Sequence, residues 1–165
     1  MKKETILALD PGQTTGSVLW FDSGSADEEP RVVAQDFGPR SLDNWGEAVV
    51  NAAEGIRDME HYVTRIVMED FRISGRTLKG KLNRSSITLQ GWVEVEAARL
   101  HIPVKIQGPD ERIRVTPRDL EKANMYLKGK QYHHSRDAAR HLFVWLARTK
   151  ISPWFNKNVL EVGNA

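Results

Sequence analysis

Short apolar runs that end on carboxylates or turn residues alternate with polar loops in the first 40 residues of the chain. They predict strands over Thr5–Asp10, Gly16–Asp22 and Arg31–Gly38. The first connection contains the turn Pro11-Gly12, and all connections are short. We therefore expect an antiparallel meander of three strands.

Helical periodicity begins after this meander. Apolar residues recur three and four positions apart over Leu42–Met59, Ser85–Leu100 and Ser135–Lys150, and each segment is predicted to be a helix. Two short apolar runs between them, Arg65–Met68 and Pro103–Gln107, are predicted to be strands. A meander followed by alternating helices and strands indicates an α/β protein with one mixed sheet layered by helices.

The length of 165 residues corresponds to a single domain, residues 1–165. Hydrophobic residues make up 40% of the chain and charged residues 28%, which is typical of a globular protein. Cysteine is absent, so disulfide scaffolds, thiolate zinc sites and thiol nucleophiles are excluded. No apolar run approaches the roughly 20 residues of a membrane span, and Ile6–Leu9 is too short for a secretory signal. We therefore expect a cytoplasmic location.

Charge is distributed unevenly along the chain. Residues 1–70 contain 6 Lys and Arg against 14 Asp and Glu, whereas residues 71–165 contain 18 against 8. Such a basic half suggests a polyanionic partner such as nucleic acid. The alternative is that the two halves neutralise each other across the fold.

Three carboxylates stand where catalytic groups are often found. Asp10 and Glu69 follow apolar strands, and Asp137 lies in the first turns of the last predicted helix. Carboxylates gathered from separate elements repel each other unless a cation neutralises them, and oxygen donors favour Mg²⁺ or Mn²⁺. Two such ions are a common device for phosphodiester cleavage. Each residue also has a structural alternative: a capped turn, an exposed strand end and a partner of the helix dipole, respectively.

Four segments resemble RuvC-type Holliday-junction resolvases of the RNase H-like superfamily. Ile6–Val18 (ILALDPGQTTGSV) is similar to their first strand and turn, and Val67–Phe71 (VMEDF) to their second acidic motif. His134–Ala138 (HSRDA) resembles their C-terminal helix motif. Leu89–Pro103 (LQGWVEVEAARLHIP) is similar to the helix that they place between the second acidic motif and the next strand. These segments occur in the family's order over nearly the whole chain. The short length and the basic C-terminal half are most similar to phage-encoded members.

The resemblance implies an RNase H-like five-stranded sheet, with a three-strand meander, two parallel strands and helices on both faces. It implies a metal-dependent endonuclease that resolves Holliday junctions or similar branched DNA with Mg²⁺, for which Mn²⁺ substitutes. Asp10, Glu69 and Asp137 would be metal ligands and catalytic groups. Two symmetric cuts require two active sites, so we expect a homodimer. A phage-encoded member would act in the host cytoplasm.

His134 occupies the position of a fourth acid in many relatives, one helical turn before Asp137, and some members also have histidine there. Three roles remain open for it: a fourth metal ligand, a proton carrier for the attacking water, or a surface residue near a helix start. Asp70 is expected to face the opposite side of the sheet from Glu69 and to act as a helper at most. A zinc site formed by His134, Asp137 and His141 is a further alternative.

Basic residues surround these positions. Residues 72–84 contain two glycines and no acid, which indicates either a cationic loop beside the metal site or merely a solvated loop. The proposed phosphate contacts of this loop are Arg72, Arg76, Lys79, Lys81 and Arg84. A second basic surface leads toward His134 and is predicted to be a groove for the DNA backbone, formed by Arg112, Arg114, Arg118, Lys122, Lys128 and Lys130.

Other functions compete with junction resolution. A related RNase H-like nuclease for flaps or RNA–DNA hybrids would use the same carboxylates. A non-catalytic binder of structured DNA would not depend on divalent metal. The loop lacks an aromatic residue other than Phe71 to insert between bases, which weakens the case for four-way junctions. Actin-like ATPases open with a similar acidic strand and Gly/Thr turn, but they need two such domains and the chain is too short.

Overall fold

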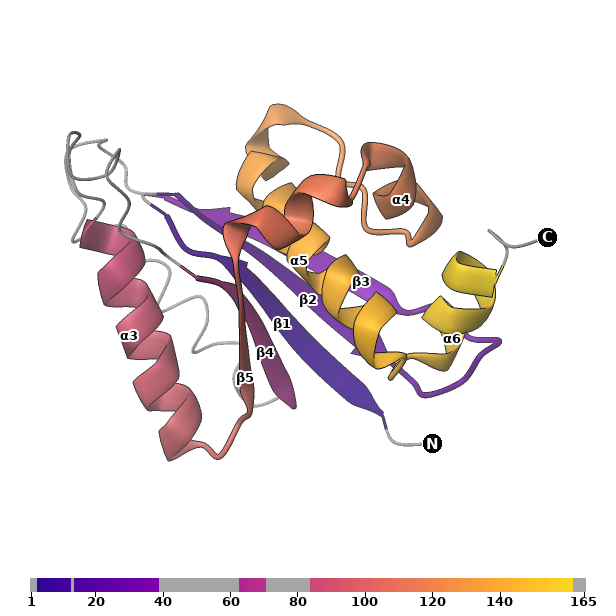
Figure 1. Ribbon diagram of the computed structural model, residues 1–165, viewed down its shortest axis with the longest axis horizontal. Coiled ribbons are helices and arrows are strands. Elements are labelled where there is room, and N and C mark those ends of the chain that lie inside the picture. Colours follow the sequence, from indigo (N-terminus) through magenta and orange to yellow (C-terminus); the bar gives the residue numbers. More distant parts are fainter. Residues whose placement is uncertain (1–2, 13, 39–62, 71–83, 162–165) are drawn as a thin grey trace.

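The computed structural model describes residues 3–12, 14–38, 63–70 and 84–161. Its centre is a five-stranded sheet of order β3-β2-β1-β4-β5 (Figure 1). The first three strands form the antiparallel meander, whereas β4 and β5 run parallel to β1. The mixed five-stranded sheet expected from the sequence, a three-strand meander with two parallel strands, is confirmed. The strands are β1 (Glu4–Asp10), β2 (Thr15–Asp22), β3 (Arg31–Phe37), β4 (Arg65–Glu69) and β5 (Val104–Gln107).

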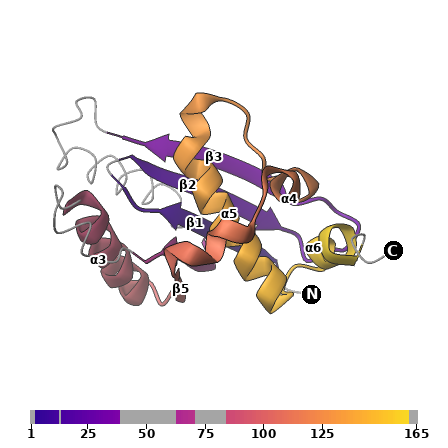
Figure 2. The same ribbon diagram turned by 45° about the horizontal axis from the view of Figure 1, so that its top comes forward.

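Two long helices cover the two faces of this sheet. Helix α3 lies on one face and α5 on the other, as both views show (Figures 1 and 2). The predicted helix over Leu42–Met59 lies outside the described residues. The helices are α3 (Arg84–Arg99), α4 (Pro117–Lys122), α5 (His133–Thr149) and α6 (Pro153–Phe155), with 3₁₀ turns at Pro109–Arg114 and Lys130–Tyr132 and a π turn at Asn156–Leu160.

Alternation along the strands divides the core into two layers. In β1, Ile6 and Ala8 pack on the side of α5, whereas Leu7 and Leu9 pack on the side of α3. All four are buried, as expected for a central strand covered on both faces. A residue at the end of such a strand therefore faces α5 or α3 according to its position in the alternation.

The C-terminal segment completes the layer on the side of α5. Phe155 is fully buried and contacts the rings of Trp20 in β2 and Phe143 in α5 edge-on. Such edge contacts are the favoured arrangement of aromatic rings. The tail around Trp154 and Phe155 therefore docks on the sheet through its aromatic residues. Among the described residues, none of the helices is long and apolar enough to cross a membrane.

Candidate active site

Asp10 and Glu69 lie side by side at the carboxyl ends of two parallel strands. Leu9 of β1 pairs with Met68 of β4, so the two acids are the next residues along neighbouring strands. Asp10 continues the alternation of Ile6 and Ala8, and Glu69 that of Val67, all on the side of α5. Both carboxylates consequently face the helix that carries Asp137.

The start of α5 is attached to the meander by Asp36 of β3. The carboxylate of Asp36 accepts hydrogen bonds from the backbone N–H of His134 at 3.1 Å and of Ser135 at 2.7 Å. It also contacts the hydroxyl of Ser135. These N–H groups have no partners within the helix, and a carboxylate at a helix N-terminus is favoured by the helix dipole. The capping group therefore comes from nearly 100 residues earlier in the chain.

Gly16 of β2 lies between Asp10 and Asp36 in the register of the sheet. A Cβ atom at this position would overlap with the backbone of His134 and Ser135. The absence of a side chain thus allows the first turn of α5 to rest directly on the sheet. This close approach places His134 beside Asp10, with 3.6 Å between Nδ1 and the carboxylate Oδ2.

Arg112 completes the cluster. Its Nε lies 3.4 Å from Oε2 of Glu69, and its Nη1 forms an ion pair with Asp137. Asp137 also pairs with Arg140, one turn later in α5. The side chains of Asp10, Glu69 and Asp137 are each less than one fifth exposed. Arg112 was expected on the outer basic surface, but the structure places its guanidinium among the carboxylates.

The local charges shift the pKa values of these groups. Burial disfavours the ionised form of Glu69, but the hydrogen bond from His141 and the charge of Arg112 outweigh it, so its pKa is lowered. Hydrogen bonding to Asp10 is the main cause of a raised pKa for His134, against the opposing effect of burial. The pKa of Arg112 is raised because the surrounding carboxylates outweigh its desolvation. The cluster is therefore a site of negative charge stabilised by cations.

The donor chemistry of the cluster fits a hard divalent cation. Three carboxylates surround the guanidinium of Arg112, the imidazole of His134 lies beside Asp10, and the chain contains no cysteine. Within the described residues, however, no three acidic or histidine side chains are arranged closely enough to hold an ion. The guanidinium of Arg112 lies among them, so an ion would have to displace it from Glu69 and Asp137.

His141 and Gln107 belong to the site, although the sequence analysis assigned them no role beside Glu69. His141 is completely buried, with Nε2 2.9 Å from Oε2 of Glu69 and Nδ1 2.9 Å from Oε1 of Gln107. Both ring nitrogens are thus engaged away from His134, which disfavours the alternative zinc site. Its position four residues after Asp137, within a buried helix face, was the available signal.

The predicted basic surfaces are only partly described. Arg114 and Arg118 are exposed, close in sequence to Arg112. Arg72, Arg76, Lys79 and Lys81 lie outside the described residues, as does the side chain of Arg84. Of the six residues predicted to form the groove, the structure thus leaves Arg114, Arg118, Lys122, Lys128 and Lys130 exposed and places Arg112 in the acidic cluster.

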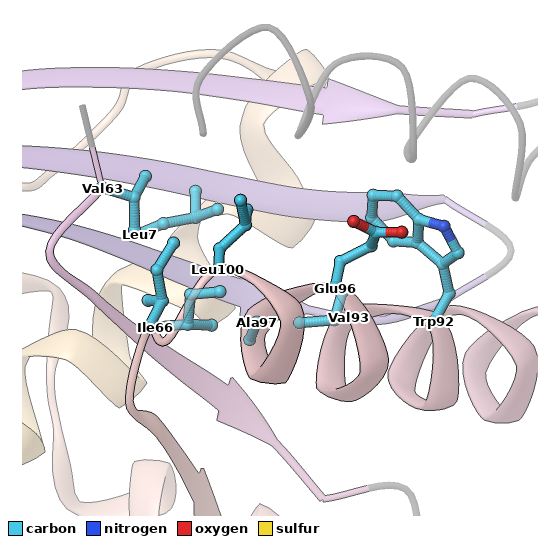
Figure 3. A pocket seen from close by; sticks show the side chains of 9 residues that line it. Leu7, Val63, Ile66, Trp92, Val93, Glu96, Ala97 and Leu100 are labelled. Atoms are coloured by element: carbon cyan, nitrogen blue, oxygen red, sulfur yellow. The ribbon is translucent and has the colours of Figure 1, made fainter. Parts of the chain in front are cut away.

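A small apolar hollow lies on the other face of the sheet (Figure 3). Leu7 and Ile66 line it from the sheet, and Val93 and Ala97 from α3. Its volume of about 20 Å³ accommodates about one water molecule, and its lining is apolar. It is a packing defect between α3 and the sheet and does not contribute to the cluster around Asp10.

Two structures of one protein resemble most of the chain. The Thermus thermophilus RuvC structure superposes with a TM-score of 0.63 and 15% identity, covering 89% of this chain and 97% of that one. The structure of T. thermophilus RuvC in complex with Holliday junction substrate gives a TM-score of 0.57 at 15% identity, covering 90% and 97%. No protein-family model and no curated protein matches the sequence. At this identity the likeness establishes a RuvC-like fold.

Proposed function

We propose that this protein is a divalent-metal-dependent endonuclease that cuts branched DNA and resolves Holliday junctions. The convergence of Asp10, Glu69 and Asp137 at one end of a RuvC-like sheet carries the proposal. Two strands and a helix, distant in sequence, bring these three carboxylates around the guanidinium of Arg112. An arrangement maintained for stability alone would not require three partly buried acids in one place.

Asp10, Glu69, Asp137 and His134 would hold Mg²⁺, or Mn²⁺ in its place. When bound, the metal supplies an activated water and stabilises the charge on the cleaved phosphate. The residues of the chain keep the donors in place: Asp36 fixes the first turn of α5, and Gly16 allows that turn to approach Asp10. Arg112, once displaced from the carboxylates, would be a cation able to pair with a DNA phosphate.

DNA is the proposed polyanionic partner. Arg114 and Arg118 are exposed and close in sequence to Arg112, and the cationic segment 72–84 follows shortly after Glu69. Phosphate contacts from these groups would supply affinity and register but no sequence preference. One of the two similar structures is a complex with Holliday junction substrate, which favours a junction over a flap. We further propose a homodimer, because resolution requires paired cuts.

A cleavage assay tests this function. The purified chain is incubated with a four-way junction, a flap, an RNA–DNA hybrid and plain duplex of matched sequence, with Mg²⁺, Mn²⁺ or EDTA. We expect paired nicks in the junction that require metal and disappear in Asp10→Asn. Preferred cleavage of the hybrid or flap would assign the site to another RNase H-like nuclease. Tight junction binding without cleavage in either metal would identify a non-catalytic DNA-binding protein.

A further inference from the structure

We propose that His141, held by Gln107, is a positioning residue that orients the carboxylate of Glu69 for metal binding. The inference deepens the proposed function and rests on it. His141 is fully buried in the middle of α5, and its Nε2 lies 2.9 Å from Oε2 of Glu69. A glutamate at a strand end has three rotatable side-chain bonds. A rigid buried donor therefore removes much of its freedom.

The topology of the sheet explains why these three residues meet. Glu69 of β4 pairs in parallel register with Gln107 of β5, so their side chains leave the same face of the sheet at the same level. His141 lies above both, one turn after Asp137 on α5. Its ring connects them, with 2.9 Å between Nδ1 and Oε1 of Gln107. Two strands and the helix that carries Asp137 are thus joined through one imidazole.

The direction of the bond to Glu69 follows from the chemistry of the partners. An ionised carboxylate only accepts hydrogen bonds, so Nε2 of His141 carries the proton and donates it. On the other side, Nε2 of Gln107 is buried and has no partner among the described residues. Exchanging the amide oxygen and nitrogen would place that N–H against Nδ1 of His141. Both orientations of Gln107 leave the donation to Glu69 unchanged.

A purely structural histidine would be satisfied by any two polar neighbours. Here one neighbour is a proposed metal ligand, and the same oxygen of Glu69 also faces Nε of Arg112 at 3.4 Å. His141 therefore holds the carboxylate of Glu69 on the side where the guanidinium of Arg112 lies. Hydrogen-bonding partners of metal ligands typically change metal affinity or activity about 10–100-fold when removed.

Two variants of His141 separate positioning from packing. In His141→Gln the amide nitrogen reaches about as far as Nε2 of the imidazole, so the donor to Glu69 is kept. In His141→Asn the shorter amide matches Nδ1, so the partner of Gln107 is kept and the donor to Glu69 is lost. The measurement is Mn²⁺ affinity without DNA, by electron paramagnetic resonance, with circular dichroism and thermal unfolding to confirm the fold.

We expect His141→Gln to bind Mn²⁺ nearly as wild type does and His141→Asn to bind it about 10–100-fold more weakly. In the Glu69→Gln background the two His141 variants should differ little, because the residue through which they act is gone. If folded His141→Asn binds Mn²⁺ as tightly as wild type, the inference about His141 is wrong, and the proposed function is unaffected. A wild type that neither binds Mn²⁺ nor cleaves any DNA would overturn the proposed function, and this inference with it.

If His141→Asn does not fold, Gln107→Leu provides the second comparison. It removes the support of the imidazole while leaving the ring and Glu69 in place. The inference requires weaker Mn²⁺ binding in this variant. Unchanged Mn²⁺ binding by a folded Gln107→Leu would therefore contradict the inference.

Discussion

Gly16 in β2 lies directly against the backbone of His134 at the start of α5. A Cβ atom at Gly16 would overlap with the carbonyl group of His134, so the helix approaches the sheet more closely than any other residue would allow. In the sheet, Gly16 pairs with Asp10 on one side and Asp36 on the other. One glycine thus brings together a proposed metal ligand, the capping carboxylate and the first turn of the helix.

Gly16→Ala should consequently displace the first turn of α5 from the sheet. Backbone atoms would have to move, and we expect a loss of about 1–3 kcal/mol in the free energy of unfolding, typical of overpacking. The cleavage rate should fall even under conditions where the variant remains folded, because His134 and Asp137 move with the turn. Chemical denaturation and the cleavage rate measure the two effects.

Gly91→Ala in α3 is the matched control. A Cβ at Gly91 meets no atom within 4 Å, and alanine favours a helix interior by about 0.5–1 kcal/mol over glycine. This variant should be as stable as wild type or more so, with normal cleavage. If Gly16→Ala and Gly91→Ala had the same free energy of unfolding and the same cleavage rate, the close approach of α5 to Gly16 would not be needed for stability or cleavage.

The strands could be predicted from the sequence to within about one residue, because buried apolar runs reveal them directly. Asp10, Glu69 and Asp137 were predicted as a set because each follows such a run or opens a helix. The predicted start of α5 at Ser135 was two residues late, since its capping group is Asp36 in a distant strand. No local pattern reveals a cap supplied from another element.

The position of Arg112 in the site could not be predicted from the sequence either, because it also depends on contacts between distant elements. Arg112 is one of many basic residues between 112 and 130, and only the folded chain shows that its guanidinium lies against Glu69. The pairing of Glu69 with Gln107 depends on the parallel register of two strands joined through α3. The sequence therefore suggested His141 only as part of an alternative zinc site, although it contacts both Glu69 and Gln107.

The second prediction concerns the three carboxylates. Asp10→Asn, Glu69→Gln and Asp137→Asn should each reduce cleavage by more than about 100-fold, since even outer partners of metal ligands cost up to that much. DNA binding should persist because the basic surface is untouched. Gel-shift and cleavage assays on a four-way junction measure both. Asp27→Asn, at a carboxylate 82% exposed, is the control. Near-normal turnover of any one variant in saturating Mg²⁺ would remove that residue from the ligand set.

The third prediction concerns Arg112, whose guanidinium lies between the carboxylates that would hold the metal. Arg112→Gln leaves Glu69 and Asp137 with less compensation, and we expect a loss of about 1–3 kcal/mol in stability without metal. Mg²⁺ should then raise the melting temperature more in this variant than in wild type, because the ion no longer competes with a side chain. Thermal unfolding with EDTA or Mg²⁺ tests this. An equal Mg²⁺ effect in both proteins would show that Arg112 does not compete with metal.

The fourth prediction is a pH dependence of the metal-free protein. The pKa of His134 is raised in the folded state, mainly by Asp10, so folding takes up protons there. This contribution to stability is complete below the ordinary pKa of about 6.5 and is lost as pH rises through the raised value. The effect should be small because the side chain is 39% exposed. Melting temperatures from pH 5.5 to 8.5 should fall more in wild type than in His134→Gln; parallel curves would contradict the His134–Asp10 interaction.

The last prediction distinguishes the three roles of His134. As a metal ligand, its replacement by aspartate should retain cleavage in Mg²⁺, because carboxylate oxygen suits Mg²⁺ better than imidazole nitrogen does. As a proton carrier, the same replacement should abolish cleavage at neutral pH in both metals and remove a limb of the pH–rate profile. We expect the first result, since His134 lies one turn before Asp137 and beside Asp10 on the face of α5 that meets the carboxylates. Cleavage rates of His134→Asp and His134→Ala in Mg²⁺ and Mn²⁺ decide between them. Full activity of His134→Ala in both metals would leave His134 as a surface residue that contacts Asp10 without taking part in cleavage.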